Sequence, residues 1–297
     1  MLQATSTPAE KRRKFRAGLE SGSLQRFPGA FNPLSAKLIE RQGFEGVYIS
    51  GAVLSADLGL PDIGLTSVTE VAGRSQQIAR MTELPTLVDA DTGFGEPMNA
   101  ARTVQLLEDA GAAGMHLEDQ VNPKRCGHLD GKDVVEADIA VRRIKAAVAA
   151  RRDPDFVIAA RTDAAAVNGL DDAIDRAKAY ADAGADLIFP EAMRGPADFE
   201  AMRAALDVPI LANMTEFGKS ELLDAQTLAD IGVNLVIYPV TLLRLAMKAA
   251  ENGLRALADQ GTQQGLLDEM QHRRELYDLL DYSDYNAFDE NVFNFRV

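Results

Sequence analysis

Short apolar runs alternate with amphipathic helical stretches from about residue 27 to residue 260. Apolar positions that recur every three or four residues predict helices, whereas short apolar runs bounded by turn residues predict buried strands. Eight strands are predicted, at residues 26–31, 46–50, 86–91, 114–119, 156–163, 186–191, 208–216 and 234–240. Helices are predicted between them, among others at 68–81, 99–111, 136–150, 170–184 and 225–232.

Strands that alternate with helices indicate an α/β fold with a parallel sheet, and eight strands are enough to close a barrel. The alternative is an open, doubly wound sheet, which usually has a glycine-rich turn after its first strand. Here that turn reads PGAFNPLS and contains no G-x-G-x-x-G. We therefore expect a single domain, a (β/α)8 TIM-type barrel at 26–260, preceded by a helical segment at 1–25.

The chain after the barrel, residues 261–297, has a different character. Residues 265–280 have a helical pattern, and the tail that follows is rich in aromatic side chains, which does not suit disorder. This aromatic arm either packs under the barrel's own bottom or docks on a neighbouring subunit. We favour the second interpretation, a C-terminal helical extension exchanged between subunits.

Composition narrows the class of partner. The chain has 297 residues, 46% of them hydrophobic, and a formal net charge of −14. So acidic a protein argues against nucleic acid or anionic lipid as a partner. No apolar run reaches the length of a membrane span, which predicts no membrane contact. The single cysteine precludes an intrachain disulfide and fits a cytoplasmic location.

Acidic residues stand at the predicted ends of the third and fourth strands. In a strand of period two, Asp89 and Asp91 face the same side, toward the barrel axis. Two adjacent carboxylates repel each other unless a cation lies between them, and oxygen ligands suit Mg²⁺. Glu118 is placed to hold a metal-bound water. An EF-hand is excluded, because its sixth position would be Phe94 and its twelfth Ala100.

A loop of about a dozen residues follows the fourth strand and carries the sequence Lys124-Arg125-Cys126-Gly127-His128. Long loops at this end of a barrel are often lids. Cations and a histidine beside a thiol lower its pKa and make it reactive. The alternatives are an inert buried cysteine, which fits poorly in so polar a loop, and half of a zinc site, for which histidines and cysteines are too few.

Arg161, at the end of the fifth strand, is predicted to point into the barrel. A buried arginine must be paired, here with Glu118 or Glu191 or with a substrate carboxylate, which a guanidinium grips with two hydrogen bonds. We favour the substrate. Arg244, one turn into the helix after the eighth strand, is a weaker candidate of the same kind, and His116 in mid-strand is interpreted as structural.

These segments resemble the isocitrate lyase/phosphoenolpyruvate mutase superfamily over nearly the whole chain. The resemblance is carried by YISGAVLSADLGLPDIG, LVDADTGFG, MHLEDQ, KRCGHLDGK, ARTDA, FPEA, ANMTEFG and YPV. It is strongest to the lyase branch that splits 2-methylisocitrate into pyruvate and succinate, and the cysteine loop is specific to the lyases. The resemblance implies Mg²⁺ as cofactor, a tricarboxylate substrate, a role in propionate breakdown through the methylcitrate cycle, and a homotetramer.

The resemblance also implies residue roles. Asp89, Asp91 and Glu118 would hold Mg²⁺, and Cys126, flanked by Lys124 and His128, would be the general acid. Tyr48 and Asp62 correspond to positions of the base and its surroundings, without a choice between them. The pyruvoyl end of the substrate would contact Ser50, Gly51, Ala52 and Arg161. The succinyl part would contact Cys126, Gly127, Glu191, Asn213, Met214, Thr215, Arg244 and Arg273.

Three other functions stay open. A sister lyase for isocitrate or another 2-hydroxy acid is the nearest, although isocitrate lyases are longer and carry a tryptophan where this chain has Phe189-Pro190. A phosphoenolpyruvate or phosphonate mutase is less compatible with the cysteine loop. A catalytically inactive protein that binds a small acid is the third, and complete chemistry at the strand ends argues against it.

Overall fold

A computed structural model describes residues 4–125, 127 and 131–293. All eight predicted strands are present and pair in parallel. They are β1 (Gln25–Pro28), β2 (Val47–Ile49), β3 (Thr86–Asp89), β4 (Gly114–Glu118), β5 (Val157–Thr162), β6 (Leu187–Pro190), β7 (Leu211–Asn213) and β8 (Leu235–Tyr238). Most are shorter than predicted, because the polar residues at their carboxyl ends turn out of the sheet.

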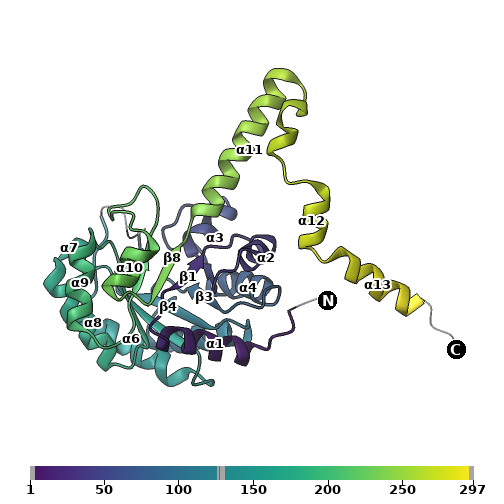
Figure 1. Ribbon diagram of the computed structural model, residues 1–297. Helices are drawn as coiled ribbons and strands as arrows, with labels where there is room; N and C mark the ends of the chain where they lie inside the picture. The colour runs from purple at the N-terminus through teal and green to yellow at the C-terminus, as the bar shows by residue number, and fades with distance from the viewer. Residues whose placement is uncertain (1–3, 126, 128–130, 294–297) are drawn as a thin grey trace.

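The eight strands close into the expected barrel. The five-stranded sheet β2-β3-β4-β5-β6 and the three-stranded sheet β1-β8-β7 meet at two seams. At one seam the Ala30 amide donates to the Tyr48 carbonyl over 2.9 Å, and at the other the Ile188 amide donates to the Pro209 carbonyl over 2.9 Å. Figure 1 shows the strands at the centre of the domain with helices around them.

Several of the helices that surround the barrel begin at capping residues readable in the sequence. Ser67 and Glu70 form a capping box at the start of α4, and Asp224 caps α10 through the Thr227 amide. The surrounding helices are α2 (Pro33–Arg41), α3 (Gly51–Asp57), α4 (Val68–Ala79), α5 (Pro97–Asp109), α6 (Ala137–Ala150), α7 (Ala164–Val167), α8 (Leu170–Asp182), α9 (Pro196–Ala205) and α10 (Ala225–Ile231).

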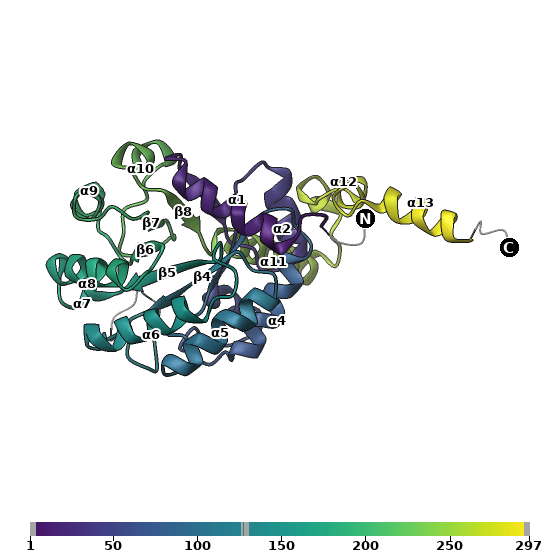
Figure 2. The ribbon, with the colours of Figure 1, turned by 90° about the horizontal axis from the view of Figure 1, so that it is seen from below.

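The N-terminal helix α1 (Pro8–Glu20) covers the amino-terminal end of the barrel (Figure 2). Its Phe15 ring packs on Phe27 of β1 with centroids 5.0 Å apart, inside the barrel's own apolar cluster. Arg12 donates to the carbonyls of Ala112 and Glu108. Because this end is closed, a ligand can enter only at the carboxyl ends of the strands.

The C-terminal arm consists of α11 (Thr241–Gln260), a short 3-10 turn (Gln264–Glu269), α12 (Arg273–Leu279) and α13 (Tyr282–Phe293). Its helix α11 projects away from the barrel (Figure 1), and α12 returns beside α2, where Lys37 pairs with Asp281 at 2.8 Å. The barrel's bottom is covered by α1 and not by the arm. Residues 265–280, which have a helical pattern, lie mostly in the 3-10 turn and in α12, and the two are separated by a break before His272, which caps α12. In the described part of the chain, no helix is both long and apolar enough to span a membrane.

Candidate active site

Two carboxylates converge at the end of β3, as predicted, but not for the predicted reason. The strand ends at Asp89, and Asp91 lies in a turn with φ of 46°, so the inference of two residues on one strand is wrong. Gly51 shows that the carboxylates converge, since a Cβ there would lie 3.0 Å from Asp89 Oδ2 and 3.3 Å from Asp91 Oδ1. The Gly51 amide donates to Asp89 over 3.0 Å.

The charges around these carboxylates favour a divalent cation. Among the described residues, six carboxylates and four cationic side chains lie at or beside the cavity at this end of the barrel, namely Asp62, Asp89, Asp91, Glu118, Asp163 and Glu191 with Lys124, Arg125, Lys132 and Arg161. Burial and the neighbouring Asp89 raise the pKa of Asp91 to about 6. Burial also raises the pKa of Glu118 well above its usual value. An added cation would relieve both effects.

The ligands available also fit Mg²⁺. Within the described ranges, Glu118 Oε1 is buried and makes no hydrogen bond, and the buried Asp91 Oδ1 lies 2.7 Å from the Lys124 ammonium. Among those residues no three acidic, histidine or cysteine side chains are placed to ligate one ion together. A small site with one or two carboxylates, completed by water and substrate oxygens, is the way proteins commonly hold Mg²⁺. The described residues thus fit this ion.

Tyr48 and His116 form a buried pair beside Asp89. The Tyr48 hydroxyl lies 2.7 Å from His116 Nε2, which is 3.6 Å from Asp89 Oδ1. Burial lowers the pKa of His116 to about 4, so the imidazole is neutral, as its structural interpretation requires. Burial and Asp89 raise the pKa of Tyr48 well above its usual value. Tyr48 is therefore a neutral phenol here, poorly suited to remove a proton.

Lys124 connects the cysteine loop to the metal carboxylates. Its ammonium lies 2.7 Å from Asp91 Oδ1 and also forms a short contact with Asp62. Burial opposes its charge, but four surrounding carboxylates outweigh that effect and raise its pKa. Lys124 is therefore charged and anchored, and it contributes positive potential rather than acting as a base.

Arg161 is buried among three carboxylates. Its Nε and Nη2 donate to the two oxygens of Asp163 over 2.9 and 3.1 Å, and its other contacts are Glu118 at 3.2 Å and Glu191 at 3.1 Å. Burial alone would lower the pKa of Arg161, but these carboxylates raise it well above its usual value. Arg161 therefore pairs with both residues considered from the sequence, Glu118 and Glu191. That Arg161 also binds a substrate carboxylate stays a prediction.

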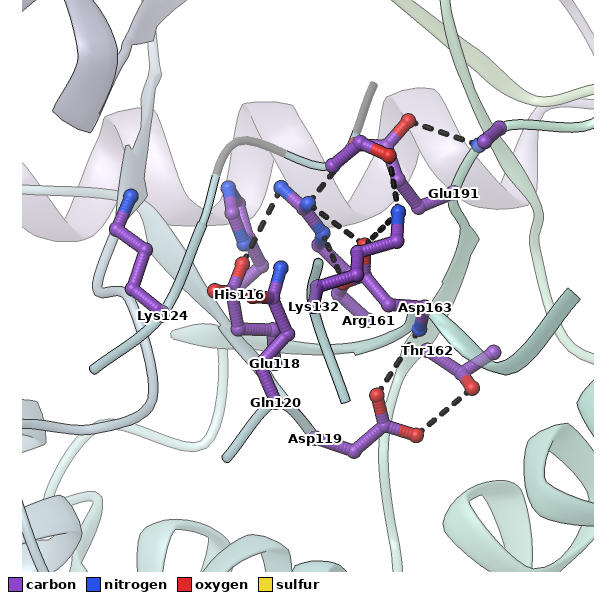
Figure 3. A network of polar contacts seen from close by, with 12 residues as sticks. His116, Glu118, Asp119, Gln120, Lys124, Lys132, Arg161, Thr162, Asp163 and Glu191 are labelled. Atoms are coloured by element: carbon purple, nitrogen blue, oxygen red, sulfur yellow. Dashed lines mark hydrogen bonds and ion pairs between the residues drawn. The ribbon is translucent and has the colours of Figure 1, made fainter. Parts of the chain in front are cut away.

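Most of the predicted site residues line one small cavity of about 50 Å³ at the barrel mouth. Side chains from six different strand ends and from the cysteine loop meet there (Figure 3 shows part of this network). The predicted residues among its lining are Tyr48, Ser50, Ala52, Asp62, Asp89, Lys124, Gly127, Arg161, Glu191, Asn213 and Thr215. Residues separated by more than a hundred positions thus form one site.

Four predicted substrate residues are not among the lining of this cavity. The Gly51 amide donates to the lining residue Asp89. The Met214 sulfur accepts from the Leu223 amide over 3.2 Å, so its side chain faces away from the barrel axis. Arg244 pairs with Glu216 at 2.6 Å at the rim. Arg273 begins α12 on the C-terminal arm and lines a separate pocket with Tyr277 and Tyr282. Cys126 and His128 lie outside the described residues.

Asp163 and Lys132 lie at the mouth and were not predicted as site residues, and neither were Arg125, Pro239 and Val240 of the cavity lining. Asp163 is fully buried and holds Arg161, and Lys132 donates to Asp163 over 2.9 Å. Asp163 could have been noticed, because it follows Arg161 by two positions at a strand end. Lys132 ends the KRCGHLDGK segment, but that segment does not indicate its partner, which is 31 residues away.

The fold and the arrangement of charged residues at the barrel mouth indicate a protein family, and the comparison with known proteins identifies it. The family model of phosphoenolpyruvate phosphomutase matches residues 15–258, and the chain belongs to this family, part of the phosphoenolpyruvate mutase/isocitrate lyase superfamily.

Individual relatives narrow the resemblance. The chain is 66% identical to the probable 2-methylisocitrate lyase 2 of Corynebacterium glutamicum, over 100% of this chain and 97% of that protein. An oxaloacetate acetylhydrolase solved with 3,3-difluorooxalacetate matches with a TM-score of 0.91 at 34% identity, over 98% of this chain and 100% of the other. A phosphonopyruvate hydrolase solved with oxalate and Mg²⁺ matches with a TM-score of 0.86 at 30% identity, over 94% and 98%.

Proposed function

We propose that this chain is a Mg²⁺-dependent carbon–carbon lyase that cleaves 2-methylisocitrate into pyruvate and succinate. One observation carries the proposal: the Asp89 carboxylate at the end of β3, the guanidinium of β5 and Gly127 of the cysteine loop face a single cavity. The full-length similarity to a probable 2-methylisocitrate lyase supports the choice of substrate.

The chain's own residues divide the substrate between two sides of the cavity. Ser50 and Ala52 line it beside Asp89, where the pyruvoyl end is placed. Arg161, from the end of β5, also lines the cavity and would pair with the carboxylate of this pyruvoyl end. Asn213 and Thr215, from the end of β7, contact the succinyl part. A buried arginine and amide side chains recognise carboxylates through charge-assisted hydrogen bonds.

The reaction requires a proton to leave the 2-hydroxyl as the C2–C3 bond breaks and a proton to reach C3. We assign the second proton to the Cys126 thiol, in a loop whose Lys124 is anchored by Asp62 and Asp91. Two residues are candidates for the base that removes the first proton. Tyr48 is the weaker candidate because it is a neutral phenol, so we assign this role to Asp62 or to a water molecule that Asp62 orients. Each group acts only when substrate fills the cavity.

A Mg²⁺ ion at Asp89 and Asp91, with Glu118 behind them, would polarise the substrate's hydroxyl and carboxylate oxygens. The Mg²⁺ complex of the phosphonopyruvate hydrolase, with its similar fold, supports this assignment. The Gly51 amide keeps Asp89 oriented over 3.0 Å, and the buried Glu118 Oε1, which makes no hydrogen bond, is available to a metal-bound water.

Substrate specificity is tested by product analysis. Purified protein with Mg²⁺ is mixed in turn with 2-methylisocitrate, isocitrate and oxaloacetate, and products are identified by NMR. We expect pyruvate and succinate from the first, at the highest kcat/KM, and no turnover in excess EDTA. The similarity to oxaloacetate acetylhydrolase makes oxaloacetate cleavage the second candidate. A higher kcat/KM for isocitrate or oxaloacetate than for 2-methylisocitrate would contradict the proposed substrate. Activity without metal would contradict the proposed Mg²⁺ site.

We also propose that the protein works in the cytoplasm as a homotetramer whose C-terminal arms are exchanged. Every residue of α11 is at least partly exposed in the single chain, with Leu254 68% exposed. Such apolar exposure favours a protein partner. If the arm docks beside a neighbour's barrel mouth, Arg273 can contribute to that neighbour's site, which explains its distance from its own. Light scattering with a truncation before residue 262 tests this assembly.

A further inference from the structure

Asp163 connects two sides of the barrel mouth. Its side chain is 0% exposed and accepts hydrogen bonds from two nitrogens of Arg161 and from Lys132 Nζ at 2.9 Å. Figure 3 shows the carboxylate between the two cations. A guanidinium held by both oxygens of one carboxylate has a fixed plane and direction. Asp163 therefore determines how Arg161 is presented to the cavity.

The position of Asp163 is itself fixed from behind. Its backbone amide donates to Asp119 Oδ1 over 2.9 Å, and the other Asp119 oxygen accepts from Thr162 and Tyr180, both over 2.8 Å (Figure 3). Arg176 joins this cluster and donates to the carbonyl of Val135, where the cysteine loop returns to the barrel. The whole set is buried between β4, β5 and α8 and makes a rigid support.

Lys132 extends this support to the cysteine loop. Its side chain is buried, and Nζ donates to the Gly127 carbonyl as well as to Asp163. Gly127 is packed so closely that a Cβ there would lie 2.3 Å from Arg161 Nη2 and 2.5 Å from Glu191 Cγ. The backbone next to Cys126 thus lies directly against the guanidinium, and only glycine fits.

We infer that Asp163 and Lys132 are positioning residues: Asp163 orients the Arg161 guanidinium, and Lys132 holds the Gly127 backbone against the same carboxylate. Buried ion pairs add little net stability, because desolvation offsets most of their attraction. The arrangement is better explained by geometry, since it ties the residue that follows the predicted proton donor in the sequence to the predicted carboxylate-binding group. The catalytic consequence rests on the proposed function, but the placement of the Gly127 backbone does not.

The first test compares three variants under saturating Mg²⁺. Lys132→Met keeps the length of the side chain and leaves Asp163 paired with Arg161, so no buried charge loses its only partner. We expect kcat on 2-methylisocitrate to fall about 10- to 100-fold, as for a small misplacement of a reacting group, with much less change in KM. Lys132→Arg should recover part of the loss. The control Lys145→Met removes an exposed lysine of α6 and should change nothing.

The second test does not depend on turnover. Cys126 is the only cysteine, so iodoacetamide alkylation reports on that residue alone. We expect Mg²⁺ with pyruvate and succinate to slow alkylation of the wild type and to slow that of Lys132→Met much less. Unchanged kcat and unchanged protection in Lys132→Met would overturn the inference, as would equal losses in the Met and Arg variants with normal protection. If 2-methylisocitrate is not cleaved but the difference in protection persists, the positioning role stands and the proposed function fails.

Discussion

At the barrel mouth charged side chains are buried, whereas along the C-terminal arm apolar side chains are exposed. Arg161, Asp163 and Glu191 are each less than a tenth exposed, while Leu254 and Phe293 of the arm are 68% and 81% exposed. Both regions depart from the usual distribution, in which apolar groups are buried and charges are solvated. The single chain leaves each region with an unmet physical requirement.

The two requirements differ in kind. Buried carboxylates in excess over cations favour a bound metal ion, which is small and positively charged. Exposed leucines and phenylalanines on a helical arm require a second protein surface, which is large and apolar. The comparison therefore separates residues selected for chemistry from residues selected for assembly. Each prediction below perturbs one region and asks whether the other responds.

The largest expected effect is on the chemistry alone. Cys126→Ser replaces the proposed acid by a hydroxyl with a much higher pKa, so kcat should fall by about 10²–10⁴-fold, the usual contribution of general acid catalysis. Substrate binding and oligomeric state should stay unchanged, as measured by calorimetry and light scattering. Near-normal turnover by this variant would remove Cys126 from the mechanism.

The next effect is on assembly. Leu254→Glu combined with Leu257→Glu places two charges on the exposed face of α11. Each leucine buried in an interface contributes roughly 1.5–3 kcal/mol, so the dissociation constant of the assembly should rise by about 10²-fold or more. Sedimentation velocity measures the shift. Met98→Glu, at an exposed position of α5 on the barrel, is the control. If both variants keep the same assembly, the arm is not an interface.

A smaller effect concerns pH at the metal carboxylates. The pKa of Asp91 is raised from 3.8 to about 6 by burial and by Asp89. In the metal-free protein this shift stabilises the fold below pH 3.8, and the contribution is lost as pH rises through about 6. Mg²⁺ requires the ionised carboxylate, so its affinity should fall by about tenfold per pH unit below that value.

Calorimetric Mg²⁺ titrations at pH 5 and pH 7.5 check this expectation. Asp91→Asn is the matched control, because an amide cannot titrate, and its weaker binding should show little dependence on pH. Equal Mg²⁺ affinity of the wild type at both pH values would mean that Asp91 is not a ligand. The oligomeric state should be the same at both, because the exposed residues of the arm that carry the assembly are apolar.

The fold and part of the mouth could be predicted from sequence because they depend on local pattern. Alternation of apolar runs with helices gave eight strands, and the parallel barrel brings their carboxyl ends together. The same pattern could have predicted that the Met214 side chain lies outside the cavity, since Met214 stands between Asn213 and Thr215, which both line the cavity. The resemblance named Met214, and the two-residue period of a strand indicates the opposite for its side chain.

What sequence could not supply are contacts between segments far apart in the chain. Lys124 meets Asp62 across 62 positions, and Lys132 meets Asp163 across 31. Neither residue type nor spacing predicts such pairs, because loop backbone and packing choose the partner. The turn at Asp91, with its positive φ, was hidden for the same reason. Local rules thus predicted which elements form, while long-range packing determined how their charges pair.

The smallest expected effect concerns an exposed ion pair on the arm, in contrast to the buried charges of the mouth. Lys248 pairs with Glu251 at 2.7 Å on α11, with both side chains more than half exposed. An exposed ion pair contributes about 0–1 kcal/mol, because water screens it and both side chains lose freedom. Lys248→Ala should therefore change the free energy of unfolding, measured in urea at fixed protein concentration, by less than about 0.5 kcal/mol. A loss that is larger, and that grows as the protein is diluted, would mean that a neighbouring subunit buries this pair, and the arm would then contribute polar as well as apolar contacts to assembly.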